Sequence, residues 1–259
     1  MTSFHALLTQ EQLPIGTYLG EFATPGIGEI LAAAGCEFVF VDMEHSGFSF
    51  QTSAQILRNL HGAGLATMLR VPSKAAHHLQ RAADIGAQGV IAPMVGTAQE
   101  ARDCIAALKY APHGQRGVAL GIAHDDFRKR SVPDAMRHAN QKTGFVALIE
   151  TAEGIANCEE IMSVPGVDAI WIGHLDLSVS LGIPGDFNNP LFLDAVTRIM
   201  AAAADAETPV GRLVGSPEEA ARCHREGCRL MCYLGDIWLL QKALGEGIAT
   251  IRSQLGNDS

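Results

Sequence analysis

Short apolar runs alternate with longer amphipathic stretches along the whole chain. Runs such as FVFV, FVALI and AIWI are apolar at every position, which is typical of parallel strands covered on both faces. Strands that alternate with helices in this way indicate a parallel sheet built from βαβ units. We expect strands at 14–19, 37–42, 66–71, 88–93, 144–149, 168–173, 208–213 and 228–233.

The stretches between these runs carry signals of helix ends. Thr97 with Glu100 three residues later is typical of a capping box, and Pro217 follows Ser216 at the expected start of another helix. Helices are expected at 26–34, 51–62, 75–85, 97–108, 153–162, 190–205, 216–226 and 236–253. Eight strands and eight helices in a chain of 259 residues predict an α/β fold, a single (β/α)8 TIM barrel domain over residues 1–259.

Two segments interrupt this rhythm, 109–143 and 177–190. Both are too long for simple connections between a strand and a helix. Long loops at the rim of a barrel are commonly functional covers, so we expect both segments to cover the rim.

Composition narrows the class of protein. Hydrophobic residues make up 47% and charged residues 18%, which supports a large buried core. The net charge of −9 and the lack of a broad basic cluster argue against a nucleic-acid partner. No apolar run reaches the roughly 18–20 residues of a membrane span, and no secretory signal is recognisable, so we expect no membrane partner and a cytoplasmic location. The six cysteines form no CxxC pair and are expected to be free thiols.

Polar residues gather where the predicted strands end. In a (β/α)8 barrel these ends form the rim that carries the active site. The candidates are Asp42, Glu44 and His45 after strand two, Arg70 after strand three, Glu150 after strand five and Asp176 after strand six.

Glu150 and Asp176 follow neighbouring strands, which stand about 4.8 Å apart in a sheet. Both carboxylates can therefore reach one ion, and a site with only oxygen ligands suits Mg²⁺ or Mn²⁺. The alternative is that the two acids cap the N-termini of helices at the rim.

His45 is a candidate general base, because the nearby Asp42 carboxylate could fix its tautomer and raise its basicity. Arg70 could bind a carboxylate or a developing oxyanion, or form a salt bridge with Asp42 or Glu44. Glu44 either binds a metal-bound water or faces solvent. None of the lysines ends a predicted strand, which argues against an imine-forming aldolase.

Six motifs in this order resemble the HpcH/HpaI aldolase family, from about Gly16 to Leu255. They are D-x-E-H at Asp42, R-V-P at Arg70, A-P-M-V at strand four, H-G-x-R-G near Arg116, I-E-T at Glu150 and I-G-x-x-D-L-S at Asp176. Members of this family, such as 4-hydroxy-2-oxoheptanedioate aldolase, are class II aldolases that depend on a divalent metal and use pyruvate.

The resemblance assigns roles to individual residues. It implies Glu150 and Asp176 as ligands of Mg²⁺, Mn²⁺ or Co²⁺, and a homohexamer, a trimer of dimers that exchange the eighth helix, here about 236–253. The implied catalytic residues are His45 as base, Asp42 as its partner, Arg70 as the group that stabilises the transition state, and Asp84, which supports the histidine across a subunit contact. Arg70 and the turn of Gly173, His174 and Leu175 are implied to bind substrate.

Two positions depart from the family pattern. Leu148 stands where well-known members carry glutamine, which removes or moves a contact to substrate. His174 lies in G-H-L-D where the family often has G-P-A-D, and its ring could donate to substrate or pack on the rim.

The expected function is that of a carbon–carbon lyase. It would reversibly cleave 4-hydroxy-2-oxo acids to an aldehyde and pyruvate, or a similar 2-oxo acid such as hydroxypyruvate. The alternative is a citrate lyase-like enzyme or one that acts on coenzyme A thioesters, with Arg116, Arg128, Lys129 and Arg130 as a groove for the phosphates. A non-catalytic barrel would predict a disrupted site, whereas every site position is filled.

Overall fold

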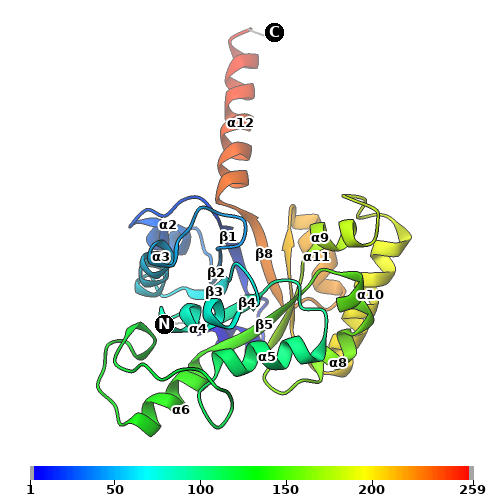
Figure 1. Ribbon diagram of the computed structural model, residues 1–259. Helices are drawn as coiled ribbons and strands as arrows, with labels where there is room; N and C mark the ends of the chain where they lie inside the picture. The colour runs from blue at the N-terminus through cyan, green and yellow to red at the C-terminus, as the bar shows by residue number, and fades with distance from the viewer. Residues whose placement is uncertain (1–2, 257–259) are drawn as a thin grey trace.

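The computed structural model describes residues 3–256 and forms a closed barrel of parallel strands in sequence order (Figure 1). β1 pairs with both β2 and β8, which closes the sheet. Every predicted strand is confirmed, with ends that differ by at most two residues. The strands are β1 (Ile15–Leu19), β2 (Phe38–Asp42), β3 (Ala66–Arg70), β4 (Gly89–Ala92), β5 (Gly144–Ile149), β6 (Ala169–Ile172), β7 (Val210–Val214) and β8 (Leu230–Gly235).

The predicted helices surround this barrel. The stretch expected at 153–162 is two short helices, because Asn157 leaves the helical conformation between them. The helices that match the sequence pattern are α2 (Ile27–Ala33), α3 (Phe50–Gly62), α4 (Ala76–Asp84), α5 (Ala98–Leu108), α7 (Ala152–Ala156), α8 (Cys158–Met162), α10 (Pro190–Asp205), α11 (Pro217–Arg225) and α12 (Asp236–Gln254).

Three further helices and a 3-10 turn were not predicted. α1 (Phe4–Thr9) inserts Phe4 beside Gly89 and Gly144, the first residues of β4 and β5, at the end of the barrel where the strands begin. α9 (His174–Ser180) follows β6 directly at the rim. The last two, η1 (Ala123–Asp125) and α6 (Val132–Lys142), lie in the 109–143 segment.

The expectation that residues 109–143 cover the rim was wrong. Arg116 from this segment pairs with Asp84 at the end of α4, and the backbone of Ala123 lies next to Gly86. Because α4 runs back towards the start of β4, these contacts lie at the end of the barrel opposite the rim. The 177–190 segment does begin at the rim, since α9 follows the end of β6.

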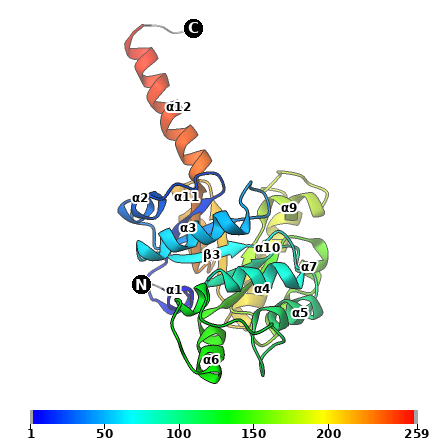
Figure 2. The ribbon, with the colours of Figure 1, turned by 60° about the vertical axis from the view of Figure 1, so that its left-hand side comes forward.

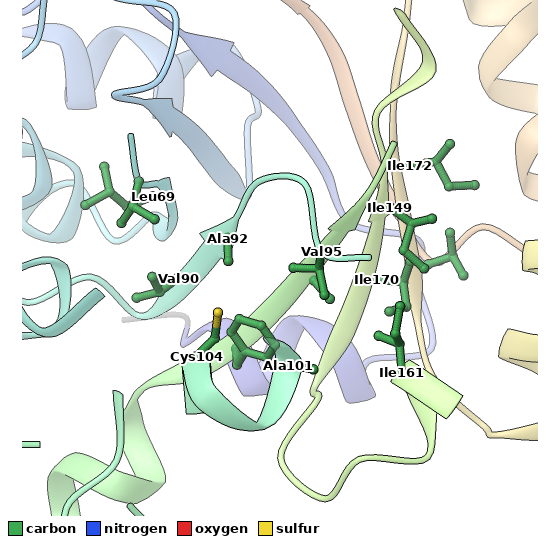
Figure 3. Packing of buried hydrophobic residues seen from close by; sticks show 14 of the residues in the cluster. Leu69, Val90, Ala92, Val95, Ala101, Cys104, Ile149, Ile161, Ile170 and Ile172 are labelled. Carbon is green, nitrogen blue, oxygen red and sulfur yellow. The ribbon is translucent and has the colours of Figure 1, made fainter. Parts of the chain in front are cut away.

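Alternate residues of each strand pack on opposite faces of the sheet. Phe38 and Phe40 of β2 point into the barrel, whereas Val39 and Val41 pack against the surrounding helices. Figure 3 shows part of this outer layer, where residues such as Val90 of β4 and Cys104 of α5 pack together. Both faces are therefore apolar, which explains why the strands read as unbroken apolar runs.

The same alternation determines where the polar residues at the strand ends point. Met68 of β3 and Leu148 of β5 belong to the inner cluster, as Phe40 does. Asp42, Arg70 and Glu150 each follow two positions later, so their side chains point inwards at the rim.

α12 projects away from the barrel in both Figure 1 and Figure 2. Its base is fixed by Asp236, whose carboxylate accepts hydrogen bonds from the backbone N–H groups of Gly20, Glu21 and Phe22 at 2.8–3.2 Å. Beyond this base, large apolar side chains of α12 are exposed. Between residues 3 and 256, no helix has the combination of length and apolar composition that crossing a lipid bilayer requires.

Candidate active site

The rim encloses a cavity of about 760 Å³. Its polar lining consists of four of the candidates predicted from the sequence, His45, Arg70, Glu150 and Asp176, together with the turn from Gly173 to Leu175. Its apolar wall comes mostly from inward-pointing residues of the strands and from the base of α12. This wall comprises Phe40, Leu148, Trp171, Ile172, Leu213, Leu234, Ile237 and Trp238, and Tyr18 completes the lining.

Asp42 is fully buried at the centre of the polar cluster. β2 and β3 pair with Asp42 beside Arg70. The guanidinium binds the carboxylate at two points, Nε to Oδ1 at 2.7 Å and Nη2 to Oδ2 at 2.7 Å. Burial alone would raise the pKa of Asp42, but the hydrogen bonds and charge of Arg70 outweigh it and hold the pKa below its usual value. Asp42 is therefore a fixed anion that orients Arg70.

Glu44 and His45 follow on the loop after β2. Their backbone N–H groups donate to Asp42 at 3.0 and 3.2 Å. Oε2 of Glu44 is buried without a well-formed hydrogen bond, 3.1 Å from Nη1 of Arg70 and 3.7 Å from Nε2 of His45. Burial raises the pKa of Glu44. The His45 side chain is 60% exposed, so its ring is accessible from the cavity.

This geometry corrects two expectations. Asp42 was expected to orient the imidazole of His45, but it binds the backbone of His45, and the carboxylate beside the ring is that of Glu44. Glu44 does not face solvent, since its side chain is only 18% exposed. The alternative in which Arg70 forms a salt bridge is confirmed for both Asp42 and Glu44.

Glu150 is almost fully buried, and its Oε1 accepts a hydrogen bond from the backbone N–H of Met94 at 2.8 Å. Burial, with smaller contributions from the negative charges of Glu44 and Asp176, raises the pKa of Glu150 to about 7. The Met94 hydrogen bond and Arg70 offset only part of this effect. Asp176 lies in the first turn of α9 and is exposed.

These acids fit a divalent cation. Oε2 of Glu150 lies against Gly173, where a Cβ would approach within 2.4 Å, so the backbone leaves room for the carboxylate and no more. A cation would offset the burial and the neighbouring negative charges that together raise the pKa of Glu150. Among residues 3–256, no three histidine, cysteine or acidic side chains cluster as a ready-made metal cage. A cation bound by the two carboxylates of Glu150 and Asp176 would keep positions for water or substrate.

The turn at the start of α9 supplies backbone donors. The N–H of Gly173 is used within the sheet, where it donates to the carbonyl of Ile149 at 3.2 Å. The next N–H groups, from His174 onwards, begin a helix and have no intrahelical acceptor. The His174 ring packs edge-on against Phe187 with ring centroids 5.2 Å apart, and burial lowers its pKa. Packing on the rim is thus confirmed, and donation to substrate by His174 or Leu175 stays a prediction.

Asp84 does not join the site of its own chain. It ends α4 at the opposite end of the barrel, where its carboxylate accepts from Nη2 of Arg116 at 2.6 Å. Its predicted action across a subunit contact stays a prediction.

Tyr18 was missed by the sequence analysis. Its hydroxyl donates to Oδ2 of Asp42 at 2.8 Å. The sequence carries only a weak sign of this role, because a tyrosine one residue before the end of β1 is typical of an ordinary core residue. Its inward position on that strand, in step with Phe40 on β2, was the only hint.

Comparisons with known proteins bear on this site. The family model of the HpcH/HpaI aldolase/citrate lyase family matches residues 17–235. A hydroxypyruvate/pyruvate aldolase of Delftia acidovorans is 32% identical over 255 residues, which cover 98% of this chain and 94% of that protein. The crystal structure of an HpcH/HpaI aldolase from Desulfitobacterium hafniense superposes with a TM-score of 0.91, at 28% identity over 97% of both chains. The crystal structure of the citrate synthase SbnG gives a TM-score of 0.88, at 26% identity over 99% of both chains.

The matched region runs from the middle of β1 to the end of β8 and includes all of the polar rim residues. With the barrel, the rim cavity and the matched family model taken together, this chain belongs to the HpcH/HpaI aldolase/citrate lyase family and is a carbon–carbon lyase.

Proposed function

We propose that this enzyme is a metal-dependent aldolase that reversibly cleaves 4-hydroxy-2-oxo acids to an aldehyde and pyruvate or hydroxypyruvate. One observation carries the proposal. The Asp42–Arg70 pair, the exposed His45 and the carboxylate of Glu150 converge on a single rim cavity, with Asp176 close enough to influence the pKa of Glu150. The name of the Delftia relative supports pyruvate and hydroxypyruvate as the 2-oxo acids.

Glu150 and Asp176 would hold the cation, which could be Mg²⁺, Mn²⁺ or Co²⁺. When bound, it supplies Lewis-acid activation of the 2-oxo acid. The protein's own side chains move the protons and stabilise the developing charge.

His45 is the group that moves protons. Its ring is exposed to the cavity, and Oε2 of the Glu44 carboxylate lies 3.7 Å from Nε2, close enough to orient the imidazole. In the cleavage direction His45 takes the proton of the C4 hydroxyl, the C3–C4 bond breaks to release the aldehyde, and the electron pair becomes that of an enolate. A proton added at C3 then gives pyruvate.

Arg70 stabilises charge on oxygen. A guanidinium has five N–H donors, and two of them, on Nε and Nη2, donate to Asp42, while Nη1 lies 3.1 Å from Glu44 without a formed hydrogen bond. The N–H groups that do not bind Asp42 can serve the substrate oxygen on which negative charge develops.

The wall of the cavity favours an uncharged aldehyde. Leu148, Trp171 and Leu213 are apolar, and Arg70 is already paired with two carboxylates. A second carboxylate on the aldehyde would be buried without a cation from these residues, which is costly.

A homo-oligomer is the second part of the proposal. Apolar residues of α12 recur every three or four positions, as on a helix face that packs against a partner. They are Leu240, Leu244, Ile248 and Ile251, each at least 40% exposed. We propose that α12 packs on a neighbouring copy and that dimers of this kind form a hexamer. Light scattering measures the mass, and a monomer would contradict this proposal.

The SbnG likeness keeps a citrate-like condensation as the second candidate. An enzyme that acts on coenzyme A thioesters was expected to use Arg116 to bind a phosphate. Arg116 is instead buried against Asp84 and is not free to do so. A free-thiol assay with acyl-CoA substrates separates the two functions.

The test of the proposed function is the release of pyruvate from a 4-hydroxy-2-oxo acid. We expect EDTA to abolish release and Mg²⁺, Mn²⁺ or Co²⁺ to restore it. Activity that survives chelation but is lost on treatment with borohydride and substrate would reject the proposal.

A further inference from the structure

The Tyr18 hydroxyl is bound to the carboxylate that orients Arg70. It donates to Oδ2 of Asp42 at 2.8 Å, and the same oxygen accepts from Nη2 of Arg70 at 2.7 Å. Tyr18 lines the cavity but belongs neither to the predicted metal ligands nor to the predicted acid–base groups. Its hydroxyl is used by Asp42, so this bond bears on the reaction through Asp42.

The bond to Tyr18 adds to the contacts that set the plane of the Asp42 carboxylate. The terminal torsion of an aspartate side chain is broad, so hydrogen bonds have to fix it. Oδ1 accepts from Nε of Arg70 and the N–H of Glu44, and Oδ2 accepts from Nη2 of Arg70, the N–H of His45 and the Tyr18 hydroxyl. The plane of the carboxylate is thus set from several directions. The guanidinium binds both oxygens of this carboxylate, so its orientation follows that of the carboxylate and its remaining N–H groups point in a fixed direction.

The ring of Tyr18 is itself held tightly. A Cβ at Gly20 would lie 2.5 Å from its Cε1, and one at Gly235 would lie 2.6 Å from its Cδ1, so both glycines leave only enough room for the ring. Trp238, in the first turn of α12, packs on it with ring centroids 5.2 Å apart, and Phe40 lies at 5.9 Å on the neighbouring strand. A ring seated in this way cannot swing its hydroxyl away from Asp42.

We propose that Tyr18 is a positioning residue that fixes Asp42 and, through it, the direction in which Arg70 presents its free N–H groups. The consequence for turnover rests on the proposed function, whereas the consequence for Arg70 itself does not. Loss of the hydroxyl lets the pair turn, which exposes Arg70 and slows the step that Arg70 stabilises. Binding of the 2-oxo acid at the predicted metal ligands is unaffected.

The experiment compares Tyr18→Phe with Tyr233→Phe. Tyr233 is partly buried, as Tyr18 is, but it packs in the outer layer between β8 and the helices. The first readout is the rate at which phenylglyoxal modifies Arg70, followed by peptide mass spectrometry, which requires no activity. The second is kcat and KM for pyruvate release.

For Tyr18→Phe we expect Arg70 to be modified severalfold faster and kcat to fall about tenfold, the effect of one hydrogen bond to a charged group, with KM within about twofold of the parent. Tyr233→Phe should match the parent in both readouts. An unchanged rate of Arg70 modification would overturn the inference, as would a loss confined to KM. If the parent releases no pyruvate, the proposed function fails, and the modification rate still decides the role of Tyr18.

Discussion

Each end of the barrel holds an arginine–carboxylate pair, and the pair at the rim faces a cavity. At the rim, Arg70 binds Asp42 and also lines the open cavity. At the opposite end, Arg116 is fully enclosed, bound to Asp84 and stacked 4.5 Å above the Tyr110 ring. A buried ion pair therefore does not by itself indicate chemistry. What distinguishes the rim is the adjoining Glu150 carboxylate, whose pKa is raised to about 7.

The largest effect is expected from Glu150→Gln, which removes the buried acid without changing its size. Pyruvate release should fall at least about 1,000-fold, because the predicted metal ligand is lost and metal-assisted steps are worth several kcal/mol. The matched control is Glu160→Gln, an exposed glutamate on α8. Steady-state kinetics with saturating Mn²⁺ measures both variants. If the Glu150→Gln enzyme were as active as the control, Glu150 would not be what distinguishes the rim from the opposite end of the barrel.

The metal-free protein should lose stability as the pH rises. The folded-state pKa of Glu150, about 7, lies above its ordinary value of 4.5. The native state therefore binds this proton more tightly, and the stabilisation is complete below about pH 4.5 and is lost as the pH rises through about 7. The difference amounts to on the order of 3 kcal/mol. Urea unfolding at pH 5 and pH 8, for the parent and Glu150→Gln in EDTA, measures it. A pH dependence that is the same in both proteins would show that Glu150 is not the cause.

Arg70→Lys tests whether the Asp42–Arg70 pair needs the planar guanidinium group. Lysine keeps the charge but cannot bind both oxygens of Asp42 and also present donors to substrate. We expect kcat to fall about 100-fold, in the range seen when a donor to an oxyanion is removed. Arg198→Lys, at an exposed pair with Glu159, is the control and should have no effect. Equal kcat values for Arg70→Lys and the parent would contradict the role of Arg70.

Asp84→Asn tests the pair at the other end. If its role is structural, the free energy of unfolding should drop by about 2 kcal/mol, since Arg116 would keep a neutral acceptor in place of its counter-ion. The pH dependence of kcat/KM provides a second readout. A shift in this profile, with the fold intact, would show that Asp84 reaches the histidine of a neighbouring copy, as the family resemblance implies.

The smallest effect is expected for the choice of aldehyde substrate. Leu148→Gln places an amide in the apolar wall, which should improve the ratio of kcat/KM for an aldehyde with a terminal carboxylate over an uncharged one by about fivefold. Aldol synthesis from pyruvate and paired aldehydes measures this ratio. An unchanged ratio would mean that another residue sets the preference for the aldehyde.

The barrel could be predicted because its signals are local. A strand apolar on both faces, as Phe38 to Val41 is, can lie only between a filled interior and a layer of helices. The inward positions of Asp42, Arg70 and Glu150 follow from the alternation along their own strands. The short helices α1 and α9 were missed because six or seven residues give too few turns for a helical period to stand out.

The contacts across strands could not be predicted. The bond from Tyr18 to Asp42 depends on the alignment of β1 and β2 and on two glycines that make room for the ring. The position of Glu44 beside His45 depends on the path of a loop, and the pairing of Asp84 with Arg116 on how a long segment folds back. Each is a tertiary contact that leaves no periodic trace in the sequence.

The proposed chemistry depends on one divalent cation bound between Glu150 and Asp176. Crystals soaked with Mn²⁺ and pyruvate, measured near the manganese absorption edge, test it most directly. We expect a single strong anomalous peak in contact with both carboxylates and with the pyruvate. A peak elsewhere in the cavity, or none while pyruvate is bound, would contradict it.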